Sequence, residues 1–230
     1  MEAIILAGGF GTRLAQILKD VPKPMAPVCG RPFLEYQLDW LAEQGVDRVV
    51  LAVGYKKECI MDHFGAVYRN VTIAYSQEDT PLYTGGAARK AIERCREERV
   101  FIVNGDTYFP ADLKKLRACA AEKNAAAAVA VKRMFDFDRY GTVVFDEAYC
   151  INAFLEKRPC RDGYINGGIY DFATTALKDY PTAFSMENDC FPRLAAAGNL
   201  VACPDEADFI DIGIPEDYSR IQDLLRGKGP

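Results

Sequence analysis

The turn that follows the first apolar segment carries the clearest chemical signal in the chain. Residues 6–14 read Leu-Ala-Gly-Gly-Phe-Gly-Thr-Arg-Leu, which places three glycines close together. Glycine has no Cβ, so backbone N–H groups can converge on an anion, and a helical turn that follows adds a positive dipole end. The spacing therefore predicts a triphosphate-binding loop. The residues expected to contact the nucleotide here are Leu6, Ala7, Gly8, Gly9, Gly11 and Thr12.

Two cations accompany this glycine loop. The loop lacks the Gly-Lys-Ser/Thr ending of a P-loop, and Leu14 stands where the dinucleotide-binding fingerprint has its third glycine. It carries Arg13 instead, whose guanidinium can hold two oxygens at once and suits a reaction in which charge builds on departing phosphates. Lys23, flanked by Pro22 and Pro24, supplies a second cation. The alternative is an ordinary glycine turn beside a solvated lysine.

Two acidic residues that are far apart in the chain could hold a metal ion. Asp106 comes just after the apolar residues 100–103, and open α/β sheets assemble their ligand sites at the carboxyl ends of strands. Asp211 offers a second carboxylate, and two carboxylates with phosphate oxygens are the usual ligand set of Mg²⁺. We therefore expect Asp106 and Asp211 to bind Mg²⁺ as a cofactor. Alternatively, an aspartate at a strand end can simply cap the next helix.

The glycine loop and the Pro-Lys-Pro of residues 22–24 resemble the hallmark of the sugar nucleotidyltransferases, the sugar-1-phosphate pyrophosphorylases. The resemblance extends over nearly the whole chain. It implies an enzyme that transfers a nucleoside monophosphate from a nucleoside triphosphate to a sugar 1-phosphate and releases pyrophosphate. It also implies that Arg13 and Lys23 are catalytic, because they stabilise the α-phosphate and the departing pyrophosphate, and that Asp106 and Asp211 hold the metal.

Residues 75–87 resemble the base-recognition stretch of this family, with Tyr83 in place of the usual glycine, which leaves the local backbone path open. Glu78 can accept two hydrogen bonds from the N1–H and amino group of guanine, whereas uracil and thymine offer one donor on that edge. This favours GTP, although Glu78 could also be an exposed loop acid. The resemblance further implies that Gly85 and Asn104 contact the nucleotide.

Three segments resemble the sugar-side elements of the family, namely residues 138–143, 154–157 and 164–170. In the family, the glutamate accepts hydrogen bonds from sugar hydroxyls, the lysine pairs with the sugar phosphate, the asparagine touches the sugar, and the glycine lets the nucleotide sugar approach the backbone. The residues implied to bind the sugar phosphate are Gly141, Glu156, Lys157 and Asn166. This chain has Gly167 where alanine is more common.

Within the family, residues 136–143, 165–170 and 209–218 are most similar to the branch that joins GTP to D-glycero-α-D-manno-heptose 1-phosphate. Ile214, where many relatives carry threonine, supports this branch. One alternative is a mannose or glucose 1-phosphate nucleotidyltransferase that uses GTP, UTP or dTTP. Another is a non-catalytic sugar-nucleotide sensor, against which the retained acids and cations argue.

The elements that must position these residues follow an α/β pattern. Short apolar runs alternate with helical patterns through the first half, as in a parallel sheet built from βαβ units, so we expect a Rossmann-like, doubly wound, mostly parallel sheet. The expected strands are residues 3–6, 48–53, 71–75, 100–103 and 126–131, and the expected helices are residues 32–45, 58–64, 85–95 and 112–123. Shorter strands at 142–145, 151–155 and 164–170 and a helix near 216–225 form a substrate-side lobe.

Length and composition fit this assignment. The 230 residues have no linker, so we expect one domain over residues 1–230, with a nucleotide-binding half at about 1–131 and a sugar-binding half at about 132–230. A net charge of −5 without a Lys/Arg block argues against nucleic-acid or membrane partners. No apolar run reaches the roughly 20 residues of a membrane span, so we expect a cytoplasmic protein with reduced cysteines. The oligomeric state stays open, a homo-oligomer included.

Overall fold

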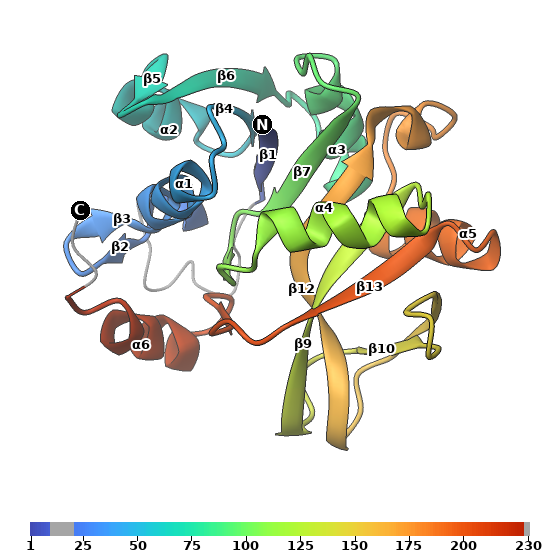
Figure 1. The fold of residues 1–230 in the computed structure, drawn as a ribbon. Coiled ribbons are helices and arrows are strands. Elements are labelled where there is room, and N and C mark those ends of the chain that lie inside the picture. Colours follow the sequence, from blue (N-terminus) through green and yellow to red (C-terminus); the bar gives the residue numbers. More distant parts are fainter. Residues whose placement is uncertain (10–20, 228–230) are drawn as a thin grey trace.

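The computed structural model describes residues 1–9 and 21–227. In this part of the chain, one mixed ten-stranded sheet runs through the molecule, and two small two-stranded sheets lie beside it (Figure 1). Helices cover both faces of the large sheet, because successive residues of its central strands belong to separate apolar clusters on its two sides. The doubly wound α/β fold expected from the sequence is therefore confirmed.

The first half of the chain builds the parallel centre of the sheet in the order β7–β1–β4–β6. These strands are almost continuous apolar runs, as expected for strands with both faces covered. Their bounds, and those of the short edge strand β5 that pairs antiparallel with β6, are β1 (Glu2–Ala7), β4 (Arg48–Val53), β5 (Val67–Tyr68), β6 (Val71–Gln77) and β7 (Arg99–Asn104). Four of the five strands expected in this half therefore form the parallel centre.

The helices lie where the crossover connections must return the chain to the sheet. One face is covered by α1 (Phe33–Glu43), α2 (Lys57–Phe64) and α4 (Leu113–Glu122), and the other by α3 (Tyr83–Ile92) and α5 (Phe191–Ala196). The expected apolar face of α1 is buried, and Gly45 ends this helix with a φ of 86°. Pro32 precedes α1 as its cap residue instead of forming its first turn. Asp112 caps α4 by accepting hydrogen bonds from Lys114 N and Lys115 N.

The second half extends the sheet with mainly antiparallel strands, of which β9 and β12 are the longest. These are β9 (Ala127–Phe137), β10 (Thr142–Phe145), β11 (Ile151–Leu155), β12 (Cys160–Ala173) and β13 (Leu200–Asp205). β12 runs antiparallel to both β7 and β9, so β9 does not adjoin the parallel centre directly. β13 pairs parallel with β9. The sequence pattern did not indicate β13, α5 or the short helices η3 (Thr174–Leu177) and η4 (Met186–Cys190).

A bulge in β12 marks the place where this strand changes partners. Its register against β9 shifts between Asn166 and Tyr170, and Gly168 has a φ of 73° within this stretch. A Cβ at Gly167 would collide with the ring of Phe109, so glycine in place of the more common alanine makes room for this ring. Before the bulge β12 pairs with β10, and after it with β7.

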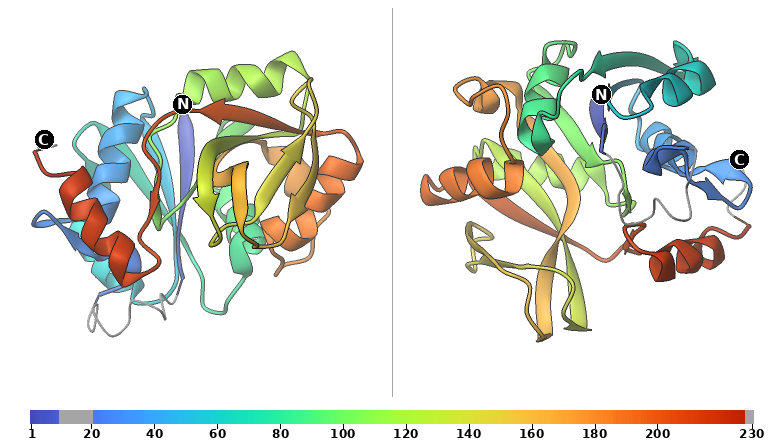
Figure 2. Two further views of the ribbon diagram at one scale, coloured as in Figure 1. Left: turned by 90° about the horizontal axis from the view of Figure 1, so that it is seen from below. Right: turned by 180° about the vertical axis from the view of Figure 1, so that it is seen from behind.

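Two small sheets connect distant parts of the chain. β8 (Thr107–Tyr108) pairs with β14 (Ile210–Asp211), and β2 (Pro27–Val28) pairs with β3 (Arg31–Pro32) just after the 3-10 helix η2 (Lys23–Met25). The last helix, α6 (Pro215–Leu224), lies next to β2 and β3 (Figure 2), where the Tyr218 hydroxyl donates to Pro27 O at 2.5 Å. The end of the chain thus packs against the segment that carries Lys23.

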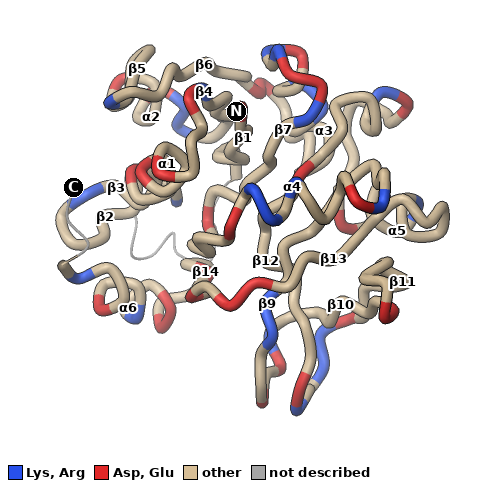
Figure 3. The backbone as a smooth tube through the Cα atoms, viewed as in Figure 1, with Lys and Arg blue, Asp and Glu red and all other residues tan. Residues whose placement is uncertain are grey.

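Acidic and basic residues are interspersed along the described chain (Figure 3). One ion-pair network joins the start of α1 to its neighbours. Arg31 contacts Glu35 at 2.8 Å and Asp39 at 2.6 Å, and His63 Nε2 lies 2.8 Å from Glu35 Oε1. His63 therefore has a structural contact on the helix surface. None of the described helices is long and apolar enough to cross a membrane.

Candidate active site

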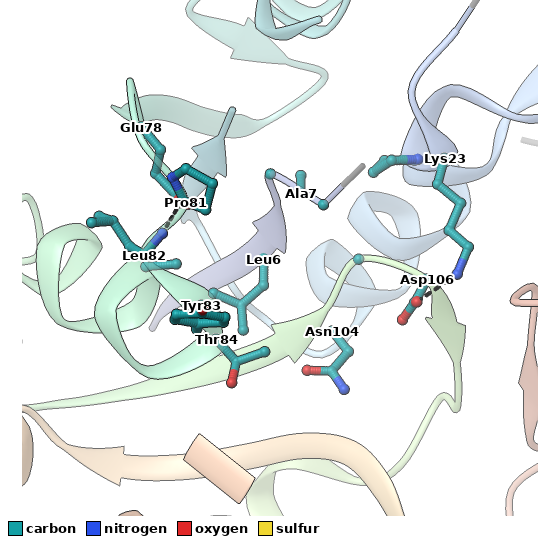
Figure 4. A pocket seen from close by; sticks show the side chains of 15 residues that line it. Leu6, Ala7, Lys23, Glu78, Pro81, Leu82, Tyr83, Thr84, Asn104 and Asp106 are labelled. Atoms are coloured by element: carbon teal, nitrogen blue, oxygen red, sulfur yellow. Dashed lines mark hydrogen bonds and ion pairs between the residues drawn. The ribbon is translucent and has the colours of Figure 1, made fainter. Parts of the chain in front are cut away.

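A cavity of about 430 Å³ opens where β1 and β7 end (Figure 4). Parallel strands present their carboxyl ends at the same edge of the sheet, where α/β folds bind ligands. The residues that the sequence predicts and that line this cavity are Leu6, Ala7, Gly8, Gly9, Lys23, Glu78, Asn104 and Asp106. Gly11, Thr12 and Arg13 lie outside the described residues.

Glycines allow three backbone segments to meet at the floor of this cavity. A Cβ on Gly8 would lie 3.0 Å from Glu78 Oε1, and one on Gly54 would lie 3.0 Å from Gly8 O. A Cβ on Gly105 would lie 2.5 Å from Leu6 O, which accepts a hydrogen bond from Gly105 N at 3.1 Å. The chain after β1 therefore passes very close to the segments after β4 and β7.

Lys23 and Asp106 form an ion pair at one end of the cavity. The distance from Lys23 Nζ to Asp106 Oδ2 is 2.7 Å, and the Lys23 side chain is 15% exposed while that of Asp106 is 40% exposed. Lys23 projects from η2, which directly follows Pro22. The cation and the carboxylate predicted from separate motifs thus lie together in the cavity.

Asp211 comes next to Asp106 through the β8–β14 pairing. Asp211 stands opposite Thr107, and Ile212 N donates to Asp106 O at 2.9 Å. Burial, together with the charge of Asp106, raises the pKa of Asp211. Within the described residues the buried Oδ1 of Asp211 has no hydrogen-bond partner. Two neighbouring carboxylates, one with an unpartnered buried oxygen, fit a divalent cation that phosphate oxygens also ligate.

Residues 1–9 and 21–227 contain no cluster of three or more His, Cys, Asp or Glu side chains suited to a metal. Asp106 and Asp211 are two carboxylates, so any cation they hold would take its other ligands from elsewhere.

Glu78 lies in the cavity just after β6. Its Oε2 accepts a hydrogen bond from Leu82 N at 3.3 Å, and burial raises the pKa of its carboxyl group. It is half-buried, which differs from the exposed loop acid that the sequence left open as an alternative. A carboxylate held by the backbone in a partly desolvated place is suited to pair with two N–H groups of a ligand.

Gly85 and Asn104 are placed differently from each other. Gly85 lies in the first turn of α3 and is not among the described residues that line the cavity. It faces Phe184 instead: its N–H donates to Phe184 O at 2.9 Å, and a Cβ at this position would collide with the Phe184 ring. Asn104 ends β7 and lines the cavity, and its backbone carbonyl accepts a hydrogen bond from Gln37 Nε2 at 2.8 Å.

The predicted sugar-side residues belong to the lobe formed by β9 to β12. Asn166 donates from Nδ2 to the Tyr170 hydroxyl at 3.0 Å, and its Oδ1 accepts from Gly168 N at 2.9 Å. Gly141 packs against Leu155 O, while Glu156 and Lys157 are exposed at the end of β11. For the part of the chain described, none of these four residues lines the 430 Å³ cavity.

Sequence reasoning did not assign a role to several residues near the site. Leu82, Tyr83 and Thr84 line the cavity. In the sequence, the tyrosine at position 83, where the family usually has glycine, was the feature that could have drawn attention to this segment. Arg139 belongs to the segment between β9 and β10 and reaches α6, where its Nη1 lies 2.7 Å from Oδ2 of the buried Asp217.

The nucleotidyl transferase family model matches residues 2–227, and the chain belongs to this family. It is therefore a nucleotidyltransferase. Two relatives are D-glycero-α-D-manno-heptose 1-phosphate guanylyltransferases. The one from Aneurinibacillus thermoaerophilus is 42% identical over 98% of this chain and 99% of its own length. The one from Campylobacter jejuni is 43% identical over 95% of this chain and 97% of its own length.

A solved structure shares the fold at similar coverage. HddC from Yersinia pseudotuberculosis, in a complex with GMP-PN, superposes with a TM-score of 0.87 at 35% identity. The match covers 97% of this chain and 99% of HddC. The antiparallel strands of the second half are therefore part of a fold that the relative has as well.

Proposed function

We propose that this chain transfers GMP from GTP to D-glycero-α-D-manno-heptose 1-phosphate and releases pyrophosphate. The observation that carries the proposal is the match, over nearly their whole length, to two relatives named for this reaction. The site supports it, because Glu78 offers guanine a partly desolvated carboxylate beside the glycine loop. The choice of sugar thus rests on the relatives, and the choice of base also on the position of Glu78.

The nucleotide is proposed to lie along the cavity, with its triphosphate at the carboxyl end of β1. The residues assigned to it are Leu6, Ala7, Gly8, Gly9, Gly11, Thr12, Glu78, Gly85 and Asn104. In this proposal Gly85 acts indirectly: its lack of a Cβ lets the first turn of α3, which carries Tyr83 and Thr84, pack against Phe184. Gly8 and Gly9 line the cavity without a Cβ, so a phosphate could approach their backbone N–H groups closely.

We propose that Asp106 and Asp211 hold Mg²⁺. When bound there, the ion would neutralise phosphate charge and polarise phosphate oxygens. The unpartnered oxygen of Asp211 and its closeness to a second acid support this assignment. Lys23, now paired with Asp106, is within reach of the same phosphates and shares in neutralising them.

The sugar 1-phosphate is proposed to bind at Gly141, Glu156, Lys157 and Asn166. Its phosphate has a second pKa of about 6, if it behaves like a phosphorylated side chain, so its oxygen is ionised at neutral pH and needs no general base. That oxygen attacks the α-phosphorus in line, a new P–O bond forms, and the bond to the β-phosphate breaks. Arg13 and Lys23 stabilise the charge on the departing pyrophosphate.

The same proposal divides the chain into a nucleotide-binding half, about residues 1–131, and a sugar-binding half, about residues 132–230. It describes a cytoplasmic enzyme that needs no nucleic acid or membrane and that can form a homo-oligomer. Light scattering of the purified protein would decide the oligomeric state.

A substrate panel tests the proposed reaction. The purified chain is incubated with GTP, UTP or dTTP and with heptose, mannose or glucose 1-phosphate, in Mg²⁺ or in EDTA, and pyrophosphate release is measured. We expect GTP with D-glycero-α-D-manno-heptose 1-phosphate to give the highest kcat/KM, and EDTA to abolish turnover. If another pair is faster, the assignment of sugar or base is wrong.

A further inference from the structure

Tyr83 stands out among the residues that line the cavity. It replaces the glycine usual in the family, its φ is 58°, and its side chain is 68% exposed. A bulky residue in the left-handed region carries backbone strain, and such strain persists only where the surrounding structure holds it. A glycine at this place would avoid that strain entirely.

Hydrogen bonds hold both neighbours of Tyr83, which constrains the backbone from which its ring projects. Leu82 N donates to Glu78 Oε2 at 3.3 Å. On the other side, Thr84 Oγ1 donates to Glu187 Oε2 at 2.6 Å and accepts from Met186 N at 2.9 Å. Tyr83 therefore sits between the residue proposed to read guanine and a hydrogen-bonded anchor on η4.

Tyr149 is the other aromatic residue with a positive φ in the described chain, at 62°. Its ring stacks on Phe145 with a centroid distance of 5.8 Å, so a packing contact accounts for its place. For Tyr83, no hydrogen bond or ring contact of the side chain is found among residues 1–9 and 21–227. The exposed ring faces a cavity it shares with Leu6 and Glu78, as Figure 4 shows.

We propose that Tyr83 is a specificity-determining residue whose ring packs against the guanine nucleoside of GTP. The proposal rests on the function proposed above. An aromatic ring on a fixed backbone loses little freedom on binding, and stacking on a base is strongest where the overlapping area is largest. A purine offers two fused rings and a pyrimidine one, so Tyr83 adds a preference for base size to the hydrogen bonds of Glu78.

Calorimetry with three probes tests this role without depending on turnover. The probes are GTP, UTP and inorganic tripolyphosphate, each with Mg²⁺, and the variants are Tyr83→Gly and Tyr83→Phe. For Tyr83→Gly we expect the Kd of GTP to rise about tenfold, that of UTP to rise less, and that of tripolyphosphate to stay within about twofold. Tyr83→Phe keeps the ring and should bind GTP like the wild type.

A thermal melt separates this role from a purely structural one. Because glycine relieves the strained φ, the Tm of Tyr83→Gly should not fall although its affinity for GTP does. Tyr149→Gly is the matched control. It also removes a tyrosine that has a left-handed φ, but one that lies outside the cavity, so its Kd for GTP should be unchanged.

Two results would overturn the inference. One is a Tyr83→Gly variant that binds GTP within twofold of the wild type. The other is an equal loss of affinity for tripolyphosphate and GTP, because this would place the ring against the phosphates and not the base. A wild type that binds GTP but turns over none of the sugar phosphates would instead contradict the proposed function and leave the Tyr83 measurement intact.

Discussion

The two halves of the molecule bring their predicted residues together to different degrees. The parallel half ends its strands at one edge, and residues from β1, β7, η2 and the segment after β6 meet in a single cavity. The antiparallel half carries Asn166 inside a bulge and Glu156 and Lys157 on an exposed segment after β11. The carboxyl ends of parallel strands all lie at one edge of a sheet, so the residues that follow them are close together. Neighbouring antiparallel strands have their carboxyl ends at opposite edges.

The largest effect should come from the acids that join the two halves. Asp106→Asn removes a charge proposed to hold the metal, so kcat should fall at least about a hundredfold, on the order of 3 kcal/mol. Because the Asp106 side chain is 40% exposed, the folded state should survive, and the Tm should stay near that of the wild type. Activity and Tm are measured together, with Asp223→Asn as the control. Near-normal turnover of folded Asp106→Asn would remove Asp106 from the metal site.

The next effect concerns the bulge by which the antiparallel half joins the sheet. Gly167→Ala places a methyl group against the Phe109 ring, so we expect a loss of about 2 kcal/mol in the free energy of unfolding. Urea denaturation measures it. Phe109→Leu makes room, and the double variant should therefore lose less than the sum of the two single variants. Simple additivity would show that the two residues do not compete for space.

A smaller effect is expected on the exposed side of the sugar-binding half. Lys157→Ala should raise the KM for the sugar 1-phosphate about tenfold, the value of one charge-assisted hydrogen bond, and leave the KM for GTP within about twofold. Steady-state kinetics with each substrate varied in turn checks this. The exposed Lys178 provides the control variant Lys178→Ala. A rise in the KM for GTP alone would assign Lys157 to the nucleotide instead.

The smallest effect lies in the ion-pair network of the parallel half, away from the cavity. Burial alone would raise the pKa of Glu35, but hydrogen bonds from His63 and Arg31 lower it below its usual value. A carboxyl group whose pKa is lower in the folded than in the unfolded state stabilises the fold when it is ionised. This contribution is fully present above the unfolded pKa of about 4.3 and is lost as the pH falls through the folded pKa. Glu35→Gln should therefore cost about 1 kcal/mol near pH 6 and almost nothing well below pH 4. Denaturation curves at both pH values, with kcat unchanged, would check it.

The elements of the parallel half could be predicted because their strands are short apolar runs between helical patterns. Pro204 lies within β13 and made that strand hard to recognise, since proline cannot donate to a sheet. The partners of β12 depend on a register shift at glycines, which no local pattern encodes. The bounds of α3 also differ from the expected residues 85–95, since the helix runs over Tyr83–Ile92.

The candidate site was predictable where a motif is local and less so where two segments must meet. The loop with Gly8 and Gly9 and the lysine at position 23 were recognised from adjacent residues. The nearness of Asp106 and Asp211 depends on the pairing of two-residue strands, which carry almost no sequence signal. The burial of Glu78 likewise arises from the glycine loop that lies against it, a contact between separate segments.

The course of β12 brings together two residues that are assigned to different substrates. Gly168 lies so close to Asn104 that a Cβ there would come within 2.9 Å of Nδ2, and Gly168 N is bonded to Asn166. The residue assigned to the sugar and the residue assigned to the nucleotide thus both lie close to Gly168, just before the backbone ladder between β12 and β7 begins. A slip of one position in that ladder would turn Asn166 to the opposite face. In the proposed assignment, the alignment of the two substrates would therefore depend on the register of β12.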